Sequence, residues 1–365
     1  MAIRNHNPGG KKAIACAHTI ALFNPSRYAL RLIALGICLI ISSISSQITW
    51  ATENHRNLTI FYTNDVRGNI DPCGCGNGQL GDISTRAAVL GSLRAQENNV
   101  LIVDSGDAFS DESLFNTFDR ARRDLIVEAM GYMGYDYLNI GDTELGFGLP
   151  VLKNIRDKAR FKLLSANILD QTDRRPIFSP YALRQVGNLK VALIGLVTDH
   201  LLKRIPPDYL QGLILADPFV TAKAYVSTLR DQSDLVIVIA HLGREGEKEL
   251  ARVVPQIDII IGGHSGRKLR SPLIIGKTLI MEGGDQGQYV GKLSMKLNEV
   301  NEVISYEHEL IAVDALHFQA NQHVRKLWQN YREKERRGDV YDRRDRRKRL
   351  IFSLEEGILK PKAKD

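Results

Sequence analysis

Short apolar runs rich in valine, isoleucine and leucine alternate with segments of helical periodicity from residue 58 onward. Several runs, such as LVIVIA at 235–240, are almost continuously apolar, which is typical of strands buried on both faces. The segments that we predict as strands are 58–63, 100–105, 136–140, 161–166, 190–197, 235–240 and 257–262, and then 272–281, 289–297 and 303–313. This alternation predicts a layered α/β domain.

Helical periodicity fills the spaces between the earlier strands. The segments that we predict as helices are 84–96, 124–133, 149–159, 218–233 and 246–254. The last strand segments follow one another without a helix, which favours antiparallel pairing. After residue 313 a helix-like segment leads into the charged cluster RRDRRKR, so we assign 58–313 to the domain and 314–365 to a helical, partly disordered basic tail.

Residues 1–51 have the layout of an export signal. Five lysines and arginines, with no acid, lie within residues 1–31, an apolar run follows at 32–41, and small residues precede a cleavage position near Ala51. We therefore expect a signal peptide that is cleaved, with a retained membrane anchor as the alternative. In both cases the predicted location is outside the cytoplasm, either periplasmic or secreted.

The formal net charge of +7 over 365 residues belongs to the two ends of the chain. Residues 32–322 carry 29 basic and 34 acidic side chains, so the body is mildly acidic and we predict no nucleic-acid partner. The basic tail is either a solvated segment or a contact for an anionic membrane surface. The sequence does not indicate an oligomeric state.

Five predicted strands are followed by residues that suit metal binding. These residues are Asp65, Asp107, Asp142 with Glu144, His241 and His264. Hard divalent ions prefer carboxylate oxygen, whereas zinc and iron also accept imidazole. Each residue has a structural explanation when taken alone; Asp107 after a glycine, for example, suits a helix cap. Because they share the carboxyl ends of strands, we expect them to converge on a divalent metal at one edge of the sheet.

The motifs at these positions resemble those of the calcineurin-like metallophosphoesterases. In chain order they read FYTNDVRGN, GDAFSDESLFN, MGYDYLNIGDTELGFG, FKLLSANIL, KVALIGLVT, VIAHLG and DIIIGGHS. Within that superfamily they resemble most closely the catalytic domain of exported 5′-nucleotidase and UDP-sugar hydrolase proteins, over about 58–313. The resemblance implies a four-layer α/β/β/α sandwich with two metal ions bound on loops at the strand ends.

Four residues of this chain match the metal ligands that the resemblance implies. Asp65 matches the first ligand of metal one, and Asp107 matches the carboxylate that bridges the two metals. His241 and His264 match two ligands of metal two. The expected cofactor is therefore a divalent ion, either zinc, manganese or iron, present once or twice.

Other positions depart from the family pattern. Arg67 stands in place of the metal-one histidine, and Gly266 in place of the last metal-one ligand. Asp142 replaces the metal-two asparagine, Thr143 replaces the catalytic histidine, and Glu144 is retained. Metal two thus keeps a credible ligand set, whereas metal one does not, which predicts an altered, mononuclear site.

Arg67 and Glu144 are the residues to which we assign catalytic roles. An arginine is always charged and cannot ligate a metal. Arg67 could instead take the space of the missing cation beside Asp65, or clamp an anionic substrate in a bidentate manner. The simpler alternative is a surface pair between Asp65 and Arg67.

Cys73 and Cys75 follow Asp65 in the same loop. As thiolates they could add metal ligands and favour zinc or iron. A disulfide between residues two apart would be strained and easily reduced, which suggests a redox role. A pair of free thiols in a glycine-rich turn is the remaining alternative.

The sequence therefore predicts an exported metal-dependent phosphoesterase with an altered site that acts on a small anionic phosphoester. The alternative is a catalytically silent relative that binds an anion, a metal or a protein partner. The resemblance does not extend to nucleotide specificity, because the 5′-nucleotidases bind the base with a second domain for which there is no room after Val313.

Overall fold

The computed structural model describes residues 56–72, 79–110, 120–200, 205 and 207–338. The predicted signal peptide or anchor, the two cysteines at 73 and 75 and the charged end of the tail lie outside the described residues. Within the described part, no helix combines the length and apolar character needed to cross a bilayer.

The first large sheet has the strand order β14-β13-β1-β2-β3-β4. From β1 to β4 neighbouring strands are parallel, whereas β1 pairs with β13, and β13 with β14, in antiparallel fashion. The strands are β1 (Arg56–Thr63), β2 (Val100–Asp104), β3 (Tyr137–Asn139), β4 (Lys162–Leu164), β13 (Tyr289–Leu297) and β14 (Val303–Ala312). The late strands β13 and β14 thus pair antiparallel, as the sequence predicts, whereas the late segment 278–281 pairs parallel with 259–261.

The second large sheet has the strand order β11-β12-β10-β9-β7-β6. Its four central strands are parallel and its two edge strands are antiparallel. The strands are β6 (Tyr181–Val186), β7 (Leu189–Val197), β9 (Leu235–His241), β10 (Ile259–Gly262), β11 (Leu273–Ile275) and β12 (Thr278–Met281). A small separate pair is formed by β5 (Ile168–Asp170) and β8 (Leu213–Leu215).

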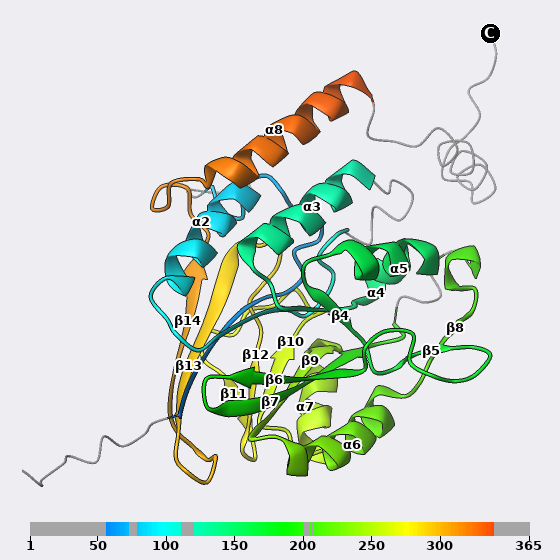
Figure 1. The fold of residues 1–365 in the computed structure, drawn as a ribbon, viewed down its shortest axis with the longest axis vertical. Coiled ribbons are helices and arrows are strands. Elements are labelled where there is room, and N and C mark those ends of the chain that lie inside the picture. Colours follow the sequence, from blue (N-terminus) through cyan, green and yellow to red (C-terminus); the bar gives the residue numbers. More distant parts are fainter. Residues whose placement is uncertain (1–55, 73–78, 111–119, 201–204, 206, 339–365) are drawn as a thin grey trace, which may run out of the picture. The chain divides into compact units, whose positions relative to one another are not determined.

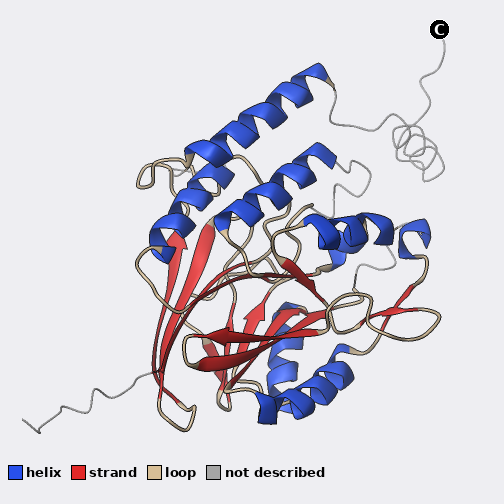
Figure 2. Cartoon of the chain, viewed as in Figure 1, coloured by secondary structure: helices blue, strands red, loops and turns tan. Residues whose placement is uncertain are grey.

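Helices cover the outer faces of the two sheets (Figures 1 and 2). On the first sheet these are α2 (Ile83–Arg94), α3 (Arg120–Met133) and α5 (Leu149–Lys158), and α8 (Gln322–Arg337) packs on α2 and α3. On the second they are α6 (Pro218–Leu229) and α7 (Gly243–Val253). The remaining helical segments are short: α4 (Asp142–Leu145), η3 (Pro207–Leu210) and η4 (Arg230–Gln232).

Strand β9 shows why the sequence folds into layers. Leu235, Ile237 and Ile239 pack between the two sheets, while the alternate residues Val236 and Val238 pack under α6 and α7. All five are fully buried, and each contributes about 1.5–3 kcal/mol relative to an exposed side chain. A third apolar layer packs the first sheet against its helices. The order of layers is therefore helix, sheet, sheet, helix, which confirms the expected α/β/β/α sandwich.

The predicted strands match the observed ones within a few residues, apart from one predicted strand that is a hairpin and three observed strands that were not predicted. The segment 272–281 is a hairpin, because Gly276 has φ +58 and separates β11 from β12. The short strands β5 and β8 were not predicted, and neither was β6, whose residues YALRQV are mostly exposed and lack an apolar alternation.

Helix α8 begins the predicted basic tail and belongs to the folded body. Asn321 caps its start by accepting from the Val324 backbone, and Gly338 ends it with φ +74. At the start of the Cys-Gly-Cys loop, Asp71 accepts a hydrogen bond of 2.9 Å from Trp328 Nε1 and pairs with Arg332. The helix therefore anchors the base of this loop.

Candidate metal centre

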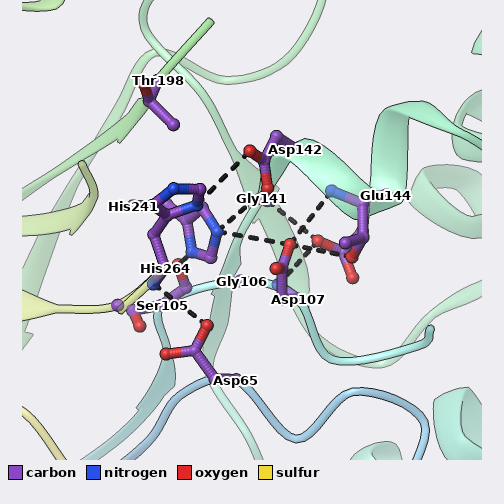
Figure 3. Close-up of polar contacts among 12 residues, drawn as sticks. Asp65, Ser105, Gly106, Asp107, Gly141, Asp142, Glu144, Thr198, His241 and His264 are labelled. Atoms are coloured by element: carbon purple, nitrogen blue, oxygen red, sulfur yellow. Dashed lines mark hydrogen bonds and ion pairs between the residues drawn. The ribbon is translucent and has the colours of Figure 1, made fainter. Parts of the chain in front are cut away.

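The predicted site residues meet at one rim of the sandwich. Asp65 follows β1, Asp107 follows β2, Asp142 follows β3, His241 ends β9, and His264 follows β10. Figure 3 shows their side chains turned toward one another. Parallel strands bring their carboxyl ends to the same edge, so the fold itself assembles residues that lie far apart in the chain.

Four of these residues form a compact cluster. One ligand atom from each of Asp107, Asp142, His241 and His264 lies within 4.8 Å of the others. His241 Nε2 is 3.2 Å from Asp142 Oδ1 and 3.3 Å from Asp107 Oδ1, and His264 Nδ1 is 3.3 Å from Asp142 Oδ2. The three residues other than His264 are buried. Two carboxylates and two imidazoles at these distances are a donor set for one borderline divalent ion.

The orientation of His241 is fixed by a hydrogen bond on the side of the ring that faces away from the cluster. Its Nδ1 lies 3.0 Å from the backbone carbonyl oxygen of Ser105, which can only accept, so Nδ1 carries the proton. The other ring nitrogen, Nε2, therefore faces Asp107 and Asp142, in the orientation of a metal-ligating imidazole.

The electrostatics of the cluster favour positive charge. Burial acts to lower the pKa of His241, but Asp107 and Asp142 outweigh it and raise that pKa well above its usual value. Burial acts to raise the pKa of Asp142, but contacts with His241 and His264 hold it below its usual range. Asp142 Oδ2 is buried and accepts no hydrogen bond in the described residues. A buried carboxylate oxygen that has a neighbouring imidazole but no hydrogen-bond donor fits a divalent cation.

Two hydrogen bonds from Thr143 aim Asp107 into the cluster. The backbone N–H and the hydroxyl of Thr143 donate to Asp107 Oδ1 at 3.0 and 2.8 Å. Asp107 has φ 55, a left-handed conformation that is unusual outside glycine and recurs at functional sites. The threonine thus supports the carboxylate that Asp107 contributes to the cluster.

Glu144 lies behind the site rather than in it. It is fully buried and accepts four backbone N–H groups, those of Asp107, Ala108, Phe109 and Gly141, at 2.8–3.2 Å. Burial raises its pKa to about 8, with the nearby charge of Asp107 adding to the effect. Its hydrogen bonds tie the loop after β2 to the loop after β3, which gives Glu144 the geometry of a positioning residue.

Asp65 lies beside the four-residue cluster and is not part of it. Oδ1 accepts from the His264 backbone at 3.0 Å, and Oδ2 accepts from Asn64 Nδ2 at 2.8 Å and from the Gly266 backbone at 3.3 Å. Burial raises the pKa of this carboxyl, while Arg67, whose Nη2 is 3.9 Å from Oδ1, acts to lower it. Asp65 therefore holds the loop that carries His264.

Comparison with known proteins shows which proteins the chain resembles. No protein-family model matches the chain. The chain is similar to a 5′-nucleotidase from Vibrio cholerae, with 29% identity over 296 residues that cover 70% of this chain and 52% of that protein. Its structure is similar to that of a 5′-nucleotidase precursor from Thermus thermophilus, with a TM-score of 0.69 and 25% identity over 76% of this chain and 59% of the other. The chain resembles the 5′-nucleotidase-like metallophosphoesterases in sequence and in fold.

A third comparison concerns the fold alone. The calcineurin-like phosphoesterase YfkN from Bacillus subtilis superposes with a TM-score of 0.66 at 19% identity, and 98% of that chain is covered by 77% of this one. Together with the sequence similarity to 5′-nucleotidases, this fold confirms the resemblance to the metallophosphoesterases that the sequence motifs indicate. The chain spans about half the length of the curated relatives it matches.

In this chain, Arg67 and Gly266 lie next to each other. A Cβ atom built on Gly266 would lie 3.0 Å from Arg67 Nη2, and the Arg67 side chain is 24% exposed. Beside Asp65 there is thus a fixed guanidinium charge. The residues on this side of the site do not fit a second metal ion, because the oxygens of Asp65 already accept hydrogen bonds and Arg67 supplies no lone pair.

His200 is a site residue that the sequence reasoning missed. It lies just beyond β7, and its ring packs edge-on against His264 with a centroid distance of 5.1 Å. The side chain is exposed, and its backbone N–H donates to Thr198 Oγ1 at 3.3 Å. The signal was present, because TDH follows the apolar run 190–197 just as the other site residues follow their strands.

Proposed function

We propose that the chain is an exported, metal-dependent phosphoester hydrolase whose site is altered to hold one metal ion. The observation that carries this proposal is the cluster of Asp107, Asp142, His241 and His264, whose ligand atoms lie within 4.8 Å of one another. Zinc, manganese and iron all suit two carboxylates and two imidazoles. Similarity to proteins named 5′-nucleotidase supports the phosphoester as the substrate class.

The bound metal would supply an activated water and positive charge at the phosphoryl group. The protein would supply the rest. His241 is oriented by the hydrogen bond of its Nδ1 to the Ser105 carbonyl, and Asp107 is aimed by Thr143. Each is fixed before the substrate arrives, which keeps the cost of reorganisation low.

Arg67 is proposed to bind the phosphoester oxygens that a second metal would otherwise contact. Its guanidinium is partly exposed, lies 3.9 Å from Asp65 and is permanently charged. An arginine fork bonds two phosphate oxygens at once, so it orients the substrate as well as neutralising it. Glu144, to which the sequence motifs led us to assign a catalytic role, is proposed to act as a positioning residue because its two oxygens accept backbone N–H groups.

The domain limits and location remain part of the proposal. We propose a signal peptide or anchor at 1–51, the catalytic domain at 58–313 and a basic tail at 314–365, with export to the periplasm or beyond the cell. The pair Cys73 and Cys75 stays a predicted metal or redox element. Nucleotides belong in the substrate panel because of the names of the relatives.

The test is turnover of an aryl phosphate monoester and of nucleoside monophosphates by protein reconstituted with zinc, manganese or iron. We expect hydrolysis with at least one ion and a loss of about 100-fold or more in His241→Gln, which removes a ligand. His317→Gln is the matched control, because His317 is 76% exposed in a loop and should leave activity unchanged.

The competing proposal is a silent relative that binds metal or anion without turnover. It is favoured by Thr143, which stands where the related enzymes have a catalytic histidine and whose hydroxyl donates to Asp107. Metal binding with no hydrolysis under any of the three ions would establish it and exclude the hydrolase.

A further inference from the structure

Two buried glutamates contact the loop that carries His264, and the proposed mechanism uses neither of them. Glu247 belongs to α7 and Glu282 follows β12, and both side chains are fully buried. Glutamate is almost never fully buried unless it is paired, because transfer of a carboxylate out of water is costly. The contacts of this pair therefore point to a role.

Glu247 holds the loop on the N-terminal side of His264. Its Oε1 accepts a hydrogen bond of 2.9 Å from the Gly263 backbone, and its carboxyl group packs so closely on Gly262 that a Cβ atom there would overlap it. A Cβ atom on Gly263 would lie 3.0 Å from His241 Nδ1. The two glycines thus contact both Glu247 and a histidine of the cluster.

Glu282 holds the loop on the C-terminal side of His264. Its Oε1 accepts a hydrogen bond of 3.2 Å from Ser265 Oγ. Its Oε2 accepts from Arg244 Nε at 3.0 Å and forms an ion pair with the same guanidinium. A permanently charged partner and a hydroxyl donor both favour the ionised form of Glu282.

The contacts of Glu247, in contrast, favour its protonated form. Its Oε2 is buried, and no group in the described part of the chain donates to it. Burial raises the pKa of Glu247 well above its usual value, and the charge of Glu282 and a hydrogen bond with it act in the same direction. A protonated Glu247 can donate to Glu282 while Oε1 still accepts from Gly263.

His264 has a backbone conformation that needs such support. Its φ of 71 is left-handed, which is uncommon for residues other than glycine and persists only where the surroundings hold it. Asp65 contributes to this by accepting from the His264 and Gly266 backbones at 3.0 and 3.3 Å. Glu247 and Glu282 bond the residues immediately before and after the histidine.

We infer that Glu247 and Glu282 are a pair of positioning residues that share one proton and hold His264 in place for the metal ion. This inference rests on the proposed function, because it concerns a ligand of the proposed metal centre. Neither glutamate belongs to the ligand cluster, so Glu247 acts through Gly263 and Glu282 acts through Ser265. Without the pair, the loop would no longer keep His264 Nδ1 3.3 Å from Asp142 Oδ2.

The first test is amide hydrogen exchange of residues 262–266 in the metal-free full chain, followed by mass spectrometry. Glu247→Leu keeps the size of the side chain and removes the acceptor, so exchange in this segment should become about tenfold faster. Glu247→Gln should stay within about twofold of wild type, because an amide can accept from Gly263 and donate to Glu282. Glu249→Gln is the matched control, a half-exposed glutamate on the same helix that should change nothing.

The second test is the affinity of the same proteins for Co²⁺, with the visible absorption spectrum of the bound ion. Glu247→Leu and Glu282→Gln should each weaken binding about 10- to 100-fold and alter the spectrum, because His264 no longer ligates in the same geometry. Glu247→Gln and Glu249→Gln should keep the wild-type affinity and spectrum. A merely structural role would lower the melting temperature and leave the cobalt spectrum of the folded protein unchanged.

Wild-type exchange and cobalt spectrum in Glu247→Leu would overturn the inference, as would a Glu247→Gln variant as impaired as Glu247→Leu. If Glu247→Leu does not fold, Ser265→Ala takes its place, because it removes one donor to Glu282 and should speed exchange in the loop about threefold. The two proposals fail separately, since exchange needs neither metal nor turnover. The expected exchange rates with no hydrolysis contradict only the hydrolase, whereas hydrolysis with unchanged exchange in the variants contradicts only the glutamate pair.

Discussion

The guanidinium of Arg67 lies over Gly266, with 3.0 Å between Nη2 and the place of a Cβ. Two departures from the family pattern, one in the first loop and one some 200 residues later, are therefore adjacent in space and complementary in size. The Arg67 guanidinium lies close to the space that a side chain at position 266 would occupy. We interpret the pair as one replacement, in which a fixed charge takes the place of a metal ion.

Restoring a ligand at both metal-one positions should add a second metal. The double variant Arg67→His with Gly266→His removes the guanidinium and provides two imidazoles near Asp65, so the metal content should rise from one to two ions per chain. Gly266 has φ +62, so the substitution costs about 1–2 kcal/mol of stability. Elemental analysis after dialysis measures the outcome, and each single variant, which lacks one donor, should stay at one ion. A double variant that also stays at one ion would contradict the interpretation.

Removing the charge of Arg67 should weaken anion binding without removing metal. Arg67→Gln should lower the affinity for inorganic phosphate about tenfold or more, because a charge-assisted contact contributes about 1.5–3 kcal/mol. Calorimetry with phosphate gives the affinity, and elemental analysis of the same sample gives the metal. Unchanged phosphate binding would reduce Arg67 to a simple partner of Asp65.

Much of the site could be predicted from the sequence because parallel strands carry their loops to one edge. Asp107, Asp142, His241 and His264 each follow an apolar run, and the fold brings them together. What the sequence could not show is the set of contacts across loops. The hydrogen bonds from Thr143 to Asp107 and the fit of Arg67 over Gly266 depend on backbone positions that no spacing rule encodes.

Most of the fold was also predicted from the sequence, and the errors in that prediction have a physical cause. Buried strands such as β7 and β9 are continuously apolar and easily recognised. Strand β6 lies at a sheet edge, where most of its side chains face solvent, so its sequence carries no periodic signal. The order of strands within each sheet was not predictable, because it is set by long-range packing.

The pH dependence of stability should reveal a buried carboxyl behind the site. Burial raises the pKa of Asp104 to about 7, above its value in an unfolded chain. The unfolded state therefore loses its proton first as pH rises, and this group destabilises the fold progressively between about pH 4 and pH 7. The free energy of unfolding of Asp104→Asn, minus that of wild type, should increase over this interval by up to about 4 kcal/mol.

Urea unfolding at several pH values measures that difference, and contributions from other groups cancel in it. A difference that is constant from pH 4 to pH 8 would show that the pKa of Asp104 is not raised.

The contact of helix α8 with Asp71 should stabilise the fold. Asp71→Ala removes the acceptor for Trp328 and the partner of Arg332, so the free energy of unfolding should fall by about 1 kcal/mol, since the pair is about one-third exposed. Asp157→Ala is the control, because its ion pair with the neighbouring Arg156 is largely exposed and should be worth less than about 0.5 kcal/mol. Equal effects of the two variants would mean that α8 does not hold the loop.

The most direct test of the account is the metal content of the natively purified protein, measured beside that of Asp142→Ala. We predict one zinc, manganese or iron ion per chain in wild type. In the variant we predict almost none, because Asp142 contacts both histidines of the cluster. Two ions per chain in wild type, or one ion retained in Asp142→Ala, would contradict the account.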